Sequence, residues 1–243
     1  MKRLPMLDIW VDAIDMERCL ALVSKYVDTG NRPYSFMAVN PEKCFSVPKN
    51  STLLEVFRRA DVLFPDGIGI VWALKLLYNM RVERVPGVEL MHRICAFAAK
   101  TGYSVFIYGA KEEVNKAAVE VLKRTYDGIN IIGRSNGYVA QENMPELVSR
   151  INKTKAQILF LALGSPKQEE WFAKYGDHLR HVKVCQGIGG TLDVVAGTVA
   201  RAPQLWRRFH MEWLYRLLAE PQRISRQKVL PLFVFRVLQK ALA

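Results

Sequence analysis

The sequence predicts an α/β protein built on a mostly parallel, Rossmann-like sheet that is flanked by helices. Half of the 243 residues are apolar and 24% are charged, which is a globular balance. Before residue 200, short β-branched or aromatic runs alternate with longer amphipathic stretches, as in a parallel sheet covered by helices. Polar and glycine-rich turns follow the strand-like runs, at the edge where open parallel sheets bind ligands.

The strand-like runs are short and rich in residues that favour extended backbone. They are Tyr34–Val39, Val62–Phe64, Tyr103–Tyr108, Ile129–Ile132, Gln157–Leu163 and Val182–Cys185. The stretches between them carry apolar residues at helical spacing, and we expect helices near 16–29, 50–60, 68–79, 88–101, 111–126, 143–154 and 167–180. Composition shifts near residue 200. We therefore expect one α/β domain over residues 1–200 and a helical C-terminal appendage over residues 201–243.

The appendage concentrates the positive charge of the chain. Lys plus Arg number 35 against 23 Asp plus Glu, a net charge of +12, and the nine basic and two acidic residues of 201–243 supply +7 of it. Aromatic residues are interleaved with these charges, which suits an anionic membrane surface, where each basic residue adds ~1 kcal/mol. A solvated basic helix that packs its apolar stripe on the body is the plain alternative. Nucleic acid is a weaker one, because no nucleic-acid-binding motif accompanies the charge.

The chain shows no sign of export or of a membrane span. Asp8 and Asp12 interrupt the start before any apolar run develops, which argues against an ordinary signal peptide. The apolar run Val229–Phe235 is far shorter than the ~20 residues that a spanning helix needs. The four cysteines lie far apart in the sequence, without metal-ligand spacing, so we expect reduced core thiols in a cytoplasmic protein. They are Cys19, Cys44, Cys95 and Cys185.

Two glycine-containing turns are candidates for phosphate binding. Gly187-Ile188-Gly189-Gly190 follows a predicted strand, and glycine lets backbone amides approach a phosphate closely. The full G-x-G-x-x-G pattern is absent, so a diphosphate site without nicotinamide is favoured over a dinucleotide site. Gly109-Ala110-Lys111 is either a second phosphate-facing turn or a tight connection between a strand and a helix.

A carboxylate stands at the end of another predicted strand. Pro65-Asp66-Gly67 is a common turn or helix-cap sequence, but its place on the converging edge makes Asp66 a candidate general base. No D-x-D motif occurs, and the four histidines have no metal-ligand spacing, so no metal site is predicted. Arginines and backbone amides should then carry the charge of a diphosphate leaving group.

Together these turns resemble the WecG/TagA/CpsF family of glycosyltransferases, nearly along the whole chain and in order. The matching blocks are Asn40-Pro41-Glu42-Lys43, Ala60-Asp61-x-x-x-Pro65-Asp66-Gly67, Arg84-Val85-x-Gly87, Gly164-Ser165-Pro166-Lys167-Gln168-Glu169, Gly187-x-Gly189-Gly190-x-x-Asp193, Arg201-Ala202-Pro203 and Glu212-Trp213-x-x-Arg216-Leu217-x-x-Glu220-Pro221-x-Arg223. The G-S-P-K-Q-E and E-W-x-x-R-L blocks are the most specific.

The resemblance implies an inverting, metal-independent transferase, cytoplasmic and peripheral on the inner face of the bacterial membrane. Such enzymes move N-acetylmannosamine or its uronic acid from UDP to N-acetylglucosaminyl-diphospho-undecaprenol, for wall teichoic acid, exopolysaccharide or a related surface polymer. No cofactor beyond the UDP-sugar donor and no nucleic-acid partner are implied, and homo-oligomerisation stays open. The rival readings are an NAD-dependent oxidoreductase and a basic nucleic-acid-binding module.

The family's functional residues fall on specific positions of this chain. Its catalytic aspartate falls on Asp66, and its active-site amides fall on Asn40 and Gln168. Arginines expected to meet diphosphate fall on Arg216, Arg223 and Arg226. The residues expected to face the nucleotide are Gly109, Lys111, Gly164, Gly187, Gly189, Gly190 and Asp193, the last of them at the ribose hydroxyls. Some members carry threonine where this chain has Ala38, so a hydroxyl contact is absent there.

Overall fold

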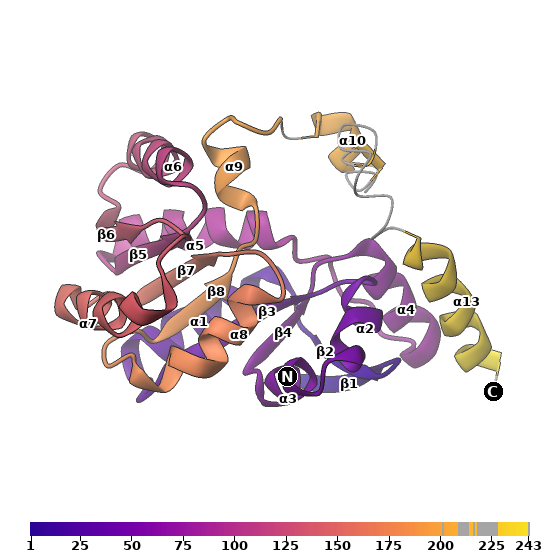
Figure 1. Cartoon of the computed structure of the whole chain (residues 1–243). Helices are drawn as coiled ribbons and strands as arrows, with labels where there is room; N and C mark the ends of the chain where they lie inside the picture. Colours follow the sequence, from indigo (N-terminus) through magenta and orange to yellow (C-terminus); the bar gives the residue numbers. More distant parts are fainter. Residues whose placement is uncertain (201, 209–213, 216, 218–227, 243) are drawn as a thin grey trace.

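A six-stranded, fully parallel sheet forms the centre of the molecule (Figure 1). The computed structural model describes residues 1–200, 202–208, 214–215, 217 and 228–242. The strand order is β4-β3-β8-β7-β5-β6, so the neighbours β3 and β8 are far apart in the sequence although all strands run in the same direction. The predicted α/β class with a mostly parallel, Rossmann-like sheet is confirmed.

All six predicted strands are present, with ends shifted by at most three residues. They are β3 (Tyr34–Val39), β4 (Val62–Pro65), β5 (Ser104–Gly109), β6 (Asn130–Ser135), β7 (Ile158–Ala162) and β8 (Val184–Gly187). Central strands such as β5 and β7 are buried along their whole length, because helices cover both faces of the sheet.

The seven predicted helices are also present. They are α1 (Met16–Thr29), α3 (Ser51–Arg59), α4 (Ile68–Tyr78), α5 (Gly87–Thr101), α6 (Glu112–Thr125), α7 (Met144–Thr154) and α8 (Lys167–Tyr175). The expectation of one helix over 167–180 was wrong at its end, since α8 stops at Tyr175 and a 3-10 turn, η3 (Gly176–His178), follows. Shorter elements not expected from the sequence are α2 (Lys43–Ser46), η1 (Val47–Lys49), η2 (Gln141–Asn143) and α9 (Thr191–Val195), whereas α10 (Gln204–Arg208) lies within the predicted helical appendage.

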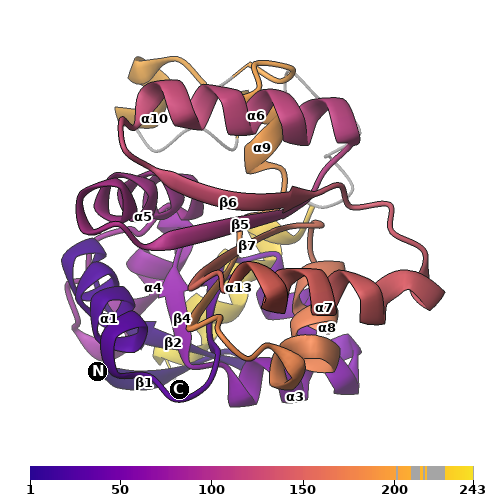
Figure 2. The ribbon, with the colours of Figure 1, turned by 90° about the vertical axis from the view of Figure 1, so that its left-hand side faces the viewer.

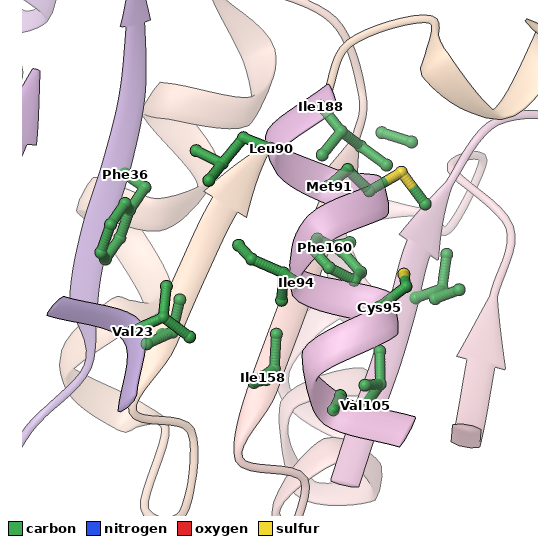
Figure 3. Close-up of a cluster of buried hydrophobic side chains, with 14 of the residues drawn as sticks. Val23, Phe36, Leu90, Met91, Ile94, Cys95, Val105, Ile158, Phe160 and Ile188 are labelled. Carbon is green, nitrogen blue, oxygen red and sulfur yellow. The ribbon is translucent and has the colours of Figure 1, made fainter. Parts of the chain in front are cut away.

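The helices form a layer on each side of the sheet (Figure 2). On one side, side chains of α1, α5 and α6 pack on alternate residues of the strands, including Phe36, Ile107 and Phe160. Figure 3 shows Leu90 and Ile94 of α5 among these buried side chains. On the other side, α7 and α8 cover the intervening residues of β5, β7 and β8. This alternation follows from the two-residue repeat of a strand. Because the helices cover the two faces of the sheet, the carboxyl ends of the strands remain the place for a ligand.

An N-terminal hairpin that the sequence analysis missed covers the β4 edge of the sheet. It consists of β1 (Lys2–Met6) and β2 (Ile9–Ala13), paired antiparallel. The fully buried Asp12 carboxylate accepts two hydrogen bonds from Arg3, both of 2.9 Å, and one of 2.8 Å from the backbone N–H of Leu63 in β4. The carboxylate thus occupies an edge N–H that would otherwise stay open to another strand.

The C-terminal helix α13 (Val229–Leu242) packs beside α4 (Figure 1). Phe233 and Val237 are 1% and 0% exposed and belong to the same hydrophobic cluster as β1, β2 and α4. The opposite side of the helix leaves large apolar side chains in solvent, namely Leu232, Phe235, Leu238 and Leu242. This part of the predicted appendage is therefore a two-sided apolar helix that is anchored to the α/β body.

The four cysteines are free and buried. Desolvation raises the pKa of Cys19 and of Cys95 to about 12, and it raises the pKa of Cys44 and Cys185 as well. The expectation of reduced core thiols is confirmed, and the thiols are poor nucleophiles at neutral pH.

Candidate active site

A cleft of about 480 Å³ opens at the carboxyl edge of the sheet. Its walls come from the turns after β3, β4 and β8, from the first residues of α5 and α8, and from α13. The lining residues are Ala38, Asn40, Pro41, Glu42, Lys43, Asp66, Gly67, Ile68, Gly69, Arg84, Pro86, Gly87, Val88, Ser165, Gln168, Gly187, Ile188, Gly189, Gly190, Thr191, Leu230, Phe233 and Val234. The cleft lies where the strand-end rule places the ligand of a parallel sheet.

Asp66 is the carboxylate of this cleft that follows directly after β4. Its side chain is 28% exposed, and its Oδ1 accepts a 3.1 Å hydrogen bond from the backbone N–H of Gly87 at the start of α5. Its own N–H donates to the carbonyl of Val39, at 3.0 Å. The carboxylate is oriented from two sides and still reaches the cleft, as a general base requires.

Arg84 stands beside Asp66, and the sequence analysis gave it no role although it lies in a matching block. Its Nε donates to the carbonyl of Asp66, and its Nη2 is 3.8 Å from Asp66 Oδ1. The side chain is 17% exposed and lines the cleft. A guanidinium is always charged at neutral pH and suits phosphate oxygens, so Arg84 adds a fixed positive charge to the site.

Asn40 is the first residue after β3 and reaches the cleft from the sheet side. Its Oδ1 accepts a 3.0 Å hydrogen bond from the backbone N–H of Lys43, which holds the start of α2. Gly67 packs directly against this turn, because a Cβ on Gly67 would stand 2.8 Å from Pro41 Cδ. The close approach brings Asn40 and the Asp66 turn to adjoining parts of the cleft wall.

Gln168, in the first turn of α8, faces the glycine turn after β8. It is 7% exposed, and its Oε1 accepts a 3.0 Å hydrogen bond from the backbone N–H of Gly189. A Cβ on Gly187 would stand 2.5 Å from Gln168 Nε2. Glycine at 187 therefore makes room for the Gln168 amide, which gives this position a second reason to be glycine besides the one predicted from phosphate binding.

The predicted nucleotide-facing residues divide between the cleft and its surroundings. Gly187, Gly189 and Gly190 line the cleft. Asp193, Gly164, Gly109 and Lys111 are not among the lining residues. Asp193 lies next to the lining residue Gly190, since its Oδ2 is 3.6 Å from where a Cβ on Gly190 would stand.

Gly164 follows β7 and Gly109 is the last residue of β5, and both have a positive φ, of +76° and +132°. Gly109 packs on the backbone of Ala162, and Lys111 is an exposed residue directly before α6. For Gly109-Ala110-Lys111 the tight-connection reading accounts for the geometry. Arg216, Arg223 and Arg226 lie outside the residues that the structure describes.

Helix α13 supplies an apolar wall of the cleft that the sequence analysis did not foresee. Leu230, Phe233 and Val234 line it. A Cβ on Gly69 in α4 would stand 3.4 Å from the Phe233 ring. A polar floor and an apolar wall thus meet in one cleft, which suits a ligand with a charged head and an apolar tail.

No group of three or more metal-ligating side chains occurs among the described residues. Within the same residues, no helix is long and apolar enough to cross a bilayer.

The fold and the cleft define an α/β protein with a candidate substrate site at the carboxyl ends of its parallel strands. Residues 4–243 match the family model described as "Glycosyl transferase WecG/TagA/CpsF family". The chain belongs to this family of glycosyltransferases, as the resemblance implied. It is 37% identical over 218 residues to a curated protein of Bacillus spizizenii, covering 90% of this chain and 83% of the relative. That relative is named N-acetylglucosaminyldiphosphoundecaprenol N-acetyl-beta-D-mannosaminyltransferase.

Proposed function

We propose that this enzyme transfers an N-acetylmannosamine-type sugar from UDP to N-acetylglucosaminyl-diphospho-undecaprenol, with inversion and without a metal ion. The observation that carries the proposal is the oriented Asp66 carboxylate in a cleft that also contains Asn40, Gln168 and Arg84. The name of the relative supports the sugar and the acceptor.

In this mechanism Asp66 removes the proton of the acceptor hydroxyl as that oxygen attacks the anomeric carbon. The bond from the anomeric carbon to the β-phosphate oxygen of UDP breaks on the opposite face, and UDP departs with the electron pair. Asn40 and Gln168 orient the two sugars, while the glycine turn at 187–190 and Asp193 hold the nucleotide. A positioned base contributes typically about 10²–10⁴-fold to the rate.

Fixed positive charge balances the diphosphate as it leaves. Arg84 lines the cleft and supplies one such charge, and the family resemblance adds Arg216, Arg223 and Arg226. Preorganised donors of this kind act on charge that develops in the transition state, which is where they lower the barrier.

The acceptor lipid and the exposed side of α13 suggest where the enzyme works. Trp72 and Leu76 of α4 are 41% and 42% exposed, and Phe235 of the adjoining α13 is 62% exposed. With the exposed basic residues Lys228, Arg236 and Lys240, these side chains form an apolar and cationic surface suited to an anionic bilayer. We propose that this surface holds the enzyme on the membrane from which the acceptor is drawn.

A screen of UDP-sugars with a short-chain N-acetylglucosaminyl diphosphate lipid tests the proposal. We expect UDP release and a disaccharide lipid with UDP-N-acetylmannosamine or its uronic acid, and the linkage stereochemistry by NMR reports inversion. The proposal would be contradicted if the enzyme turned over none of the UDP-sugars, or if it reduced a nicotinamide cofactor instead.

A further inference from the structure

A buried ion pair connects the wall of the cleft, where Lys43 lies, to Glu169 of α8. Lys43 Nζ, at the start of α2, is 2.8 Å from Glu169 Oε1 in α8, and the two side chains are only 8% and 2% exposed. Lys43 Nζ also donates to the carbonyl of Ala38 at the end of β3, at 2.9 Å. The pair therefore joins the turn after β3 to the helix that carries Gln168.

Glu169 also contacts the Gln168 amide. Its Oε1 accepts a 3.3 Å hydrogen bond from Gln168 Nε2, while Gln168 Oε1 accepts from Gly189 N–H at the other end of the amide. Reversing the amide would place Nε2 against an N–H donor and Oε1 against a carboxylate, so both ends oppose it. Glu169 thereby fixes which atom of Gln168 faces which part of the cleft.

Burial of this pair is costly for the fold. Among the described residues, Glu169 Oε2 is buried without a hydrogen-bond partner, so the carboxylate is satisfied through Oε1 alone. A buried ion pair is often no more stabilising than apolar residues of similar volume, and an unpartnered oxygen makes it less so. Stability alone therefore does not explain why these charges lie here.

We infer that Lys43 and Glu169 form a positioning pair, which holds the Gln168 amide and the Gly189 turn in the orientation that the transition state requires. Lys43 Nζ holds the Glu169 carboxylate in place through their 2.8 Å contact, and Glu169 orients the Gln168 amide. Neither Lys43 nor Glu169 is assigned contact with the reacting atoms. The inference rests on the proposed function for the role of Gln168.

A mutant cycle with Gln168 tests the inference. Because small displacements of a positioning group cost up to about 10²-fold, Glu169→Gln and Lys43→Met should each lower kcat about 10- to 100-fold while changing KM less than about twofold. In a Gln168→Ala background the same changes should lower kcat less than about twofold further, since the group through which they act is gone. If Glu169→Gln and Lys43→Met lowered kcat in the Gln168→Ala background by the same factor as in the wild type, the inference would be overturned.

Asp12→Asn is the matched control, because it makes the same carboxylate-to-amide change in another buried ion pair, outside the cleft. It should leave kcat and KM of the folded enzyme unchanged in both backgrounds. If either single variant fails to fold, the double variant Lys43→Met/Glu169→Gln, which leaves no unpaired charge buried, takes its place in the cycle.

A spectroscopic measurement separates this inference from the proposed function. In 15N-labelled protein, the side-chain NH₂ signals of Gln168, assigned by their loss in Gln168→Ala, should shift in Glu169→Gln and not in Asp12→Asn. If the wild-type enzyme transferred no sugar, the proposed function would fail. The Gln168 signals would still test whether Glu169 orients the Gln168 amide. Unshifted Gln168 signals in Glu169→Gln would overturn the inference whatever the enzyme transfers.

Discussion

At the scale of single residues, the orientation of Asp66 leads to the sharpest prediction. Asp66→Asn keeps an oxygen that can accept from Gly87 N–H, so the turn should keep its shape while the base is lost. We expect turnover to fall by about 10²–10⁴-fold, with little change in the affinity for UDP. Initial rates of UDP release and calorimetric titration with UDP measure the two quantities. Turnover near that of the wild type would remove Asp66 from the mechanism.

The four buried cysteines allow a prediction about thiol chemistry. A pKa of about 12 for Cys19 and Cys95 leaves almost no thiolate at pH 8, and burial also blocks access. Native protein treated with iodoacetamide at pH 8 should therefore gain no label within minutes, whereas the same protein in denaturant should gain four. Intact mass spectrometry counts the labels. Rapid labelling of the native protein would mean that a cysteine is exposed.

The sequence predicts some site residues better than others, for a physical reason. Asn40 and Asp66 directly follow strands, and Gly189 comes two residues after the end of β8. Because the ends of parallel strands meet at one edge, the position of these residues is a local property of the chain. Arg84 and Glu169 act through contacts between separate elements. Their sequence blocks stand out, but the contacts with Asp66 and with Lys43 exist only after the sheet has formed.

At the scale of elements, the outward side of α13 should bind lipid. Phe235→Asp places a charge on this exposed apolar side, and burial of a Phe side chain is worth about 1.5–3 kcal/mol. We expect co-sedimentation with anionic liposomes to weaken correspondingly, and Arg236→Glu/Lys240→Glu to weaken it by ~1 kcal/mol per charge. Turnover of a water-soluble acceptor should persist in both variants.

The control for this experiment is Tyr138→Asp, which replaces an aromatic residue that is 75% exposed on the loop after β6. It should leave liposome binding unchanged. Equal loss of binding in the Tyr138 variant, or full binding in the Phe235 variant, would show that α13 is not the element that contacts lipid.

The N-terminal hairpin gives a prediction about stability. Asp12→Asn removes the charge that pairs with Arg3 while the hydrogen bond to Leu63 N–H can persist, and hydrogen bonds to charged groups are worth about 1.5–3 kcal/mol. We expect the free energy of unfolding, measured by urea titration, to fall by about this amount. The exposed change Asp177→Asn should alter it by less than about 0.5 kcal/mol. An unchanged midpoint for Asp12→Asn would contradict the role given to the hairpin.

The strands and long helices were predictable because their apolar spacing repeats within each segment. The hairpin was not, because Pro5 and Asp12 argue against a strand when read locally. Asp12 is acceptable there only because Arg3 and the β4 backbone satisfy its carboxylate. The apolar wall of the cleft was missed for a similar reason. The basic residues of the appendage favoured a solvent- or membrane-facing helix, whereas Phe233 packs against elements that are far away in the sequence.

At the scale of the whole molecule, the set of charges in the cleft bears on its metal requirement. Arg84 and the glycine turn line the cleft, and the sequence lacks the D-x-D motif. We therefore expect turnover to survive excess EDTA and to gain less than about twofold from added Mg²⁺ or Mn²⁺. The assay is UDP release from enzyme dialysed against the chelator. A loss of activity that Mn²⁺ restores would mean that a metal ion takes part.

The order of strands also determines when the cleft can exist during folding. β3 and β8 are hydrogen-bonded neighbours, although Tyr34 pairs with Val184 across 150 positions of chain, and such long loops close slowly and at an entropic cost. Asn40 and Asp66 lie on the early side of this junction, and Gln168 and Gly189 lie on the late side. A partly folded chain in which either side had formed alone would have no complete cleft. A ligand that contacts both sides therefore binds only the finished fold, stabilises it by mass action, and reports on the final step of refolding.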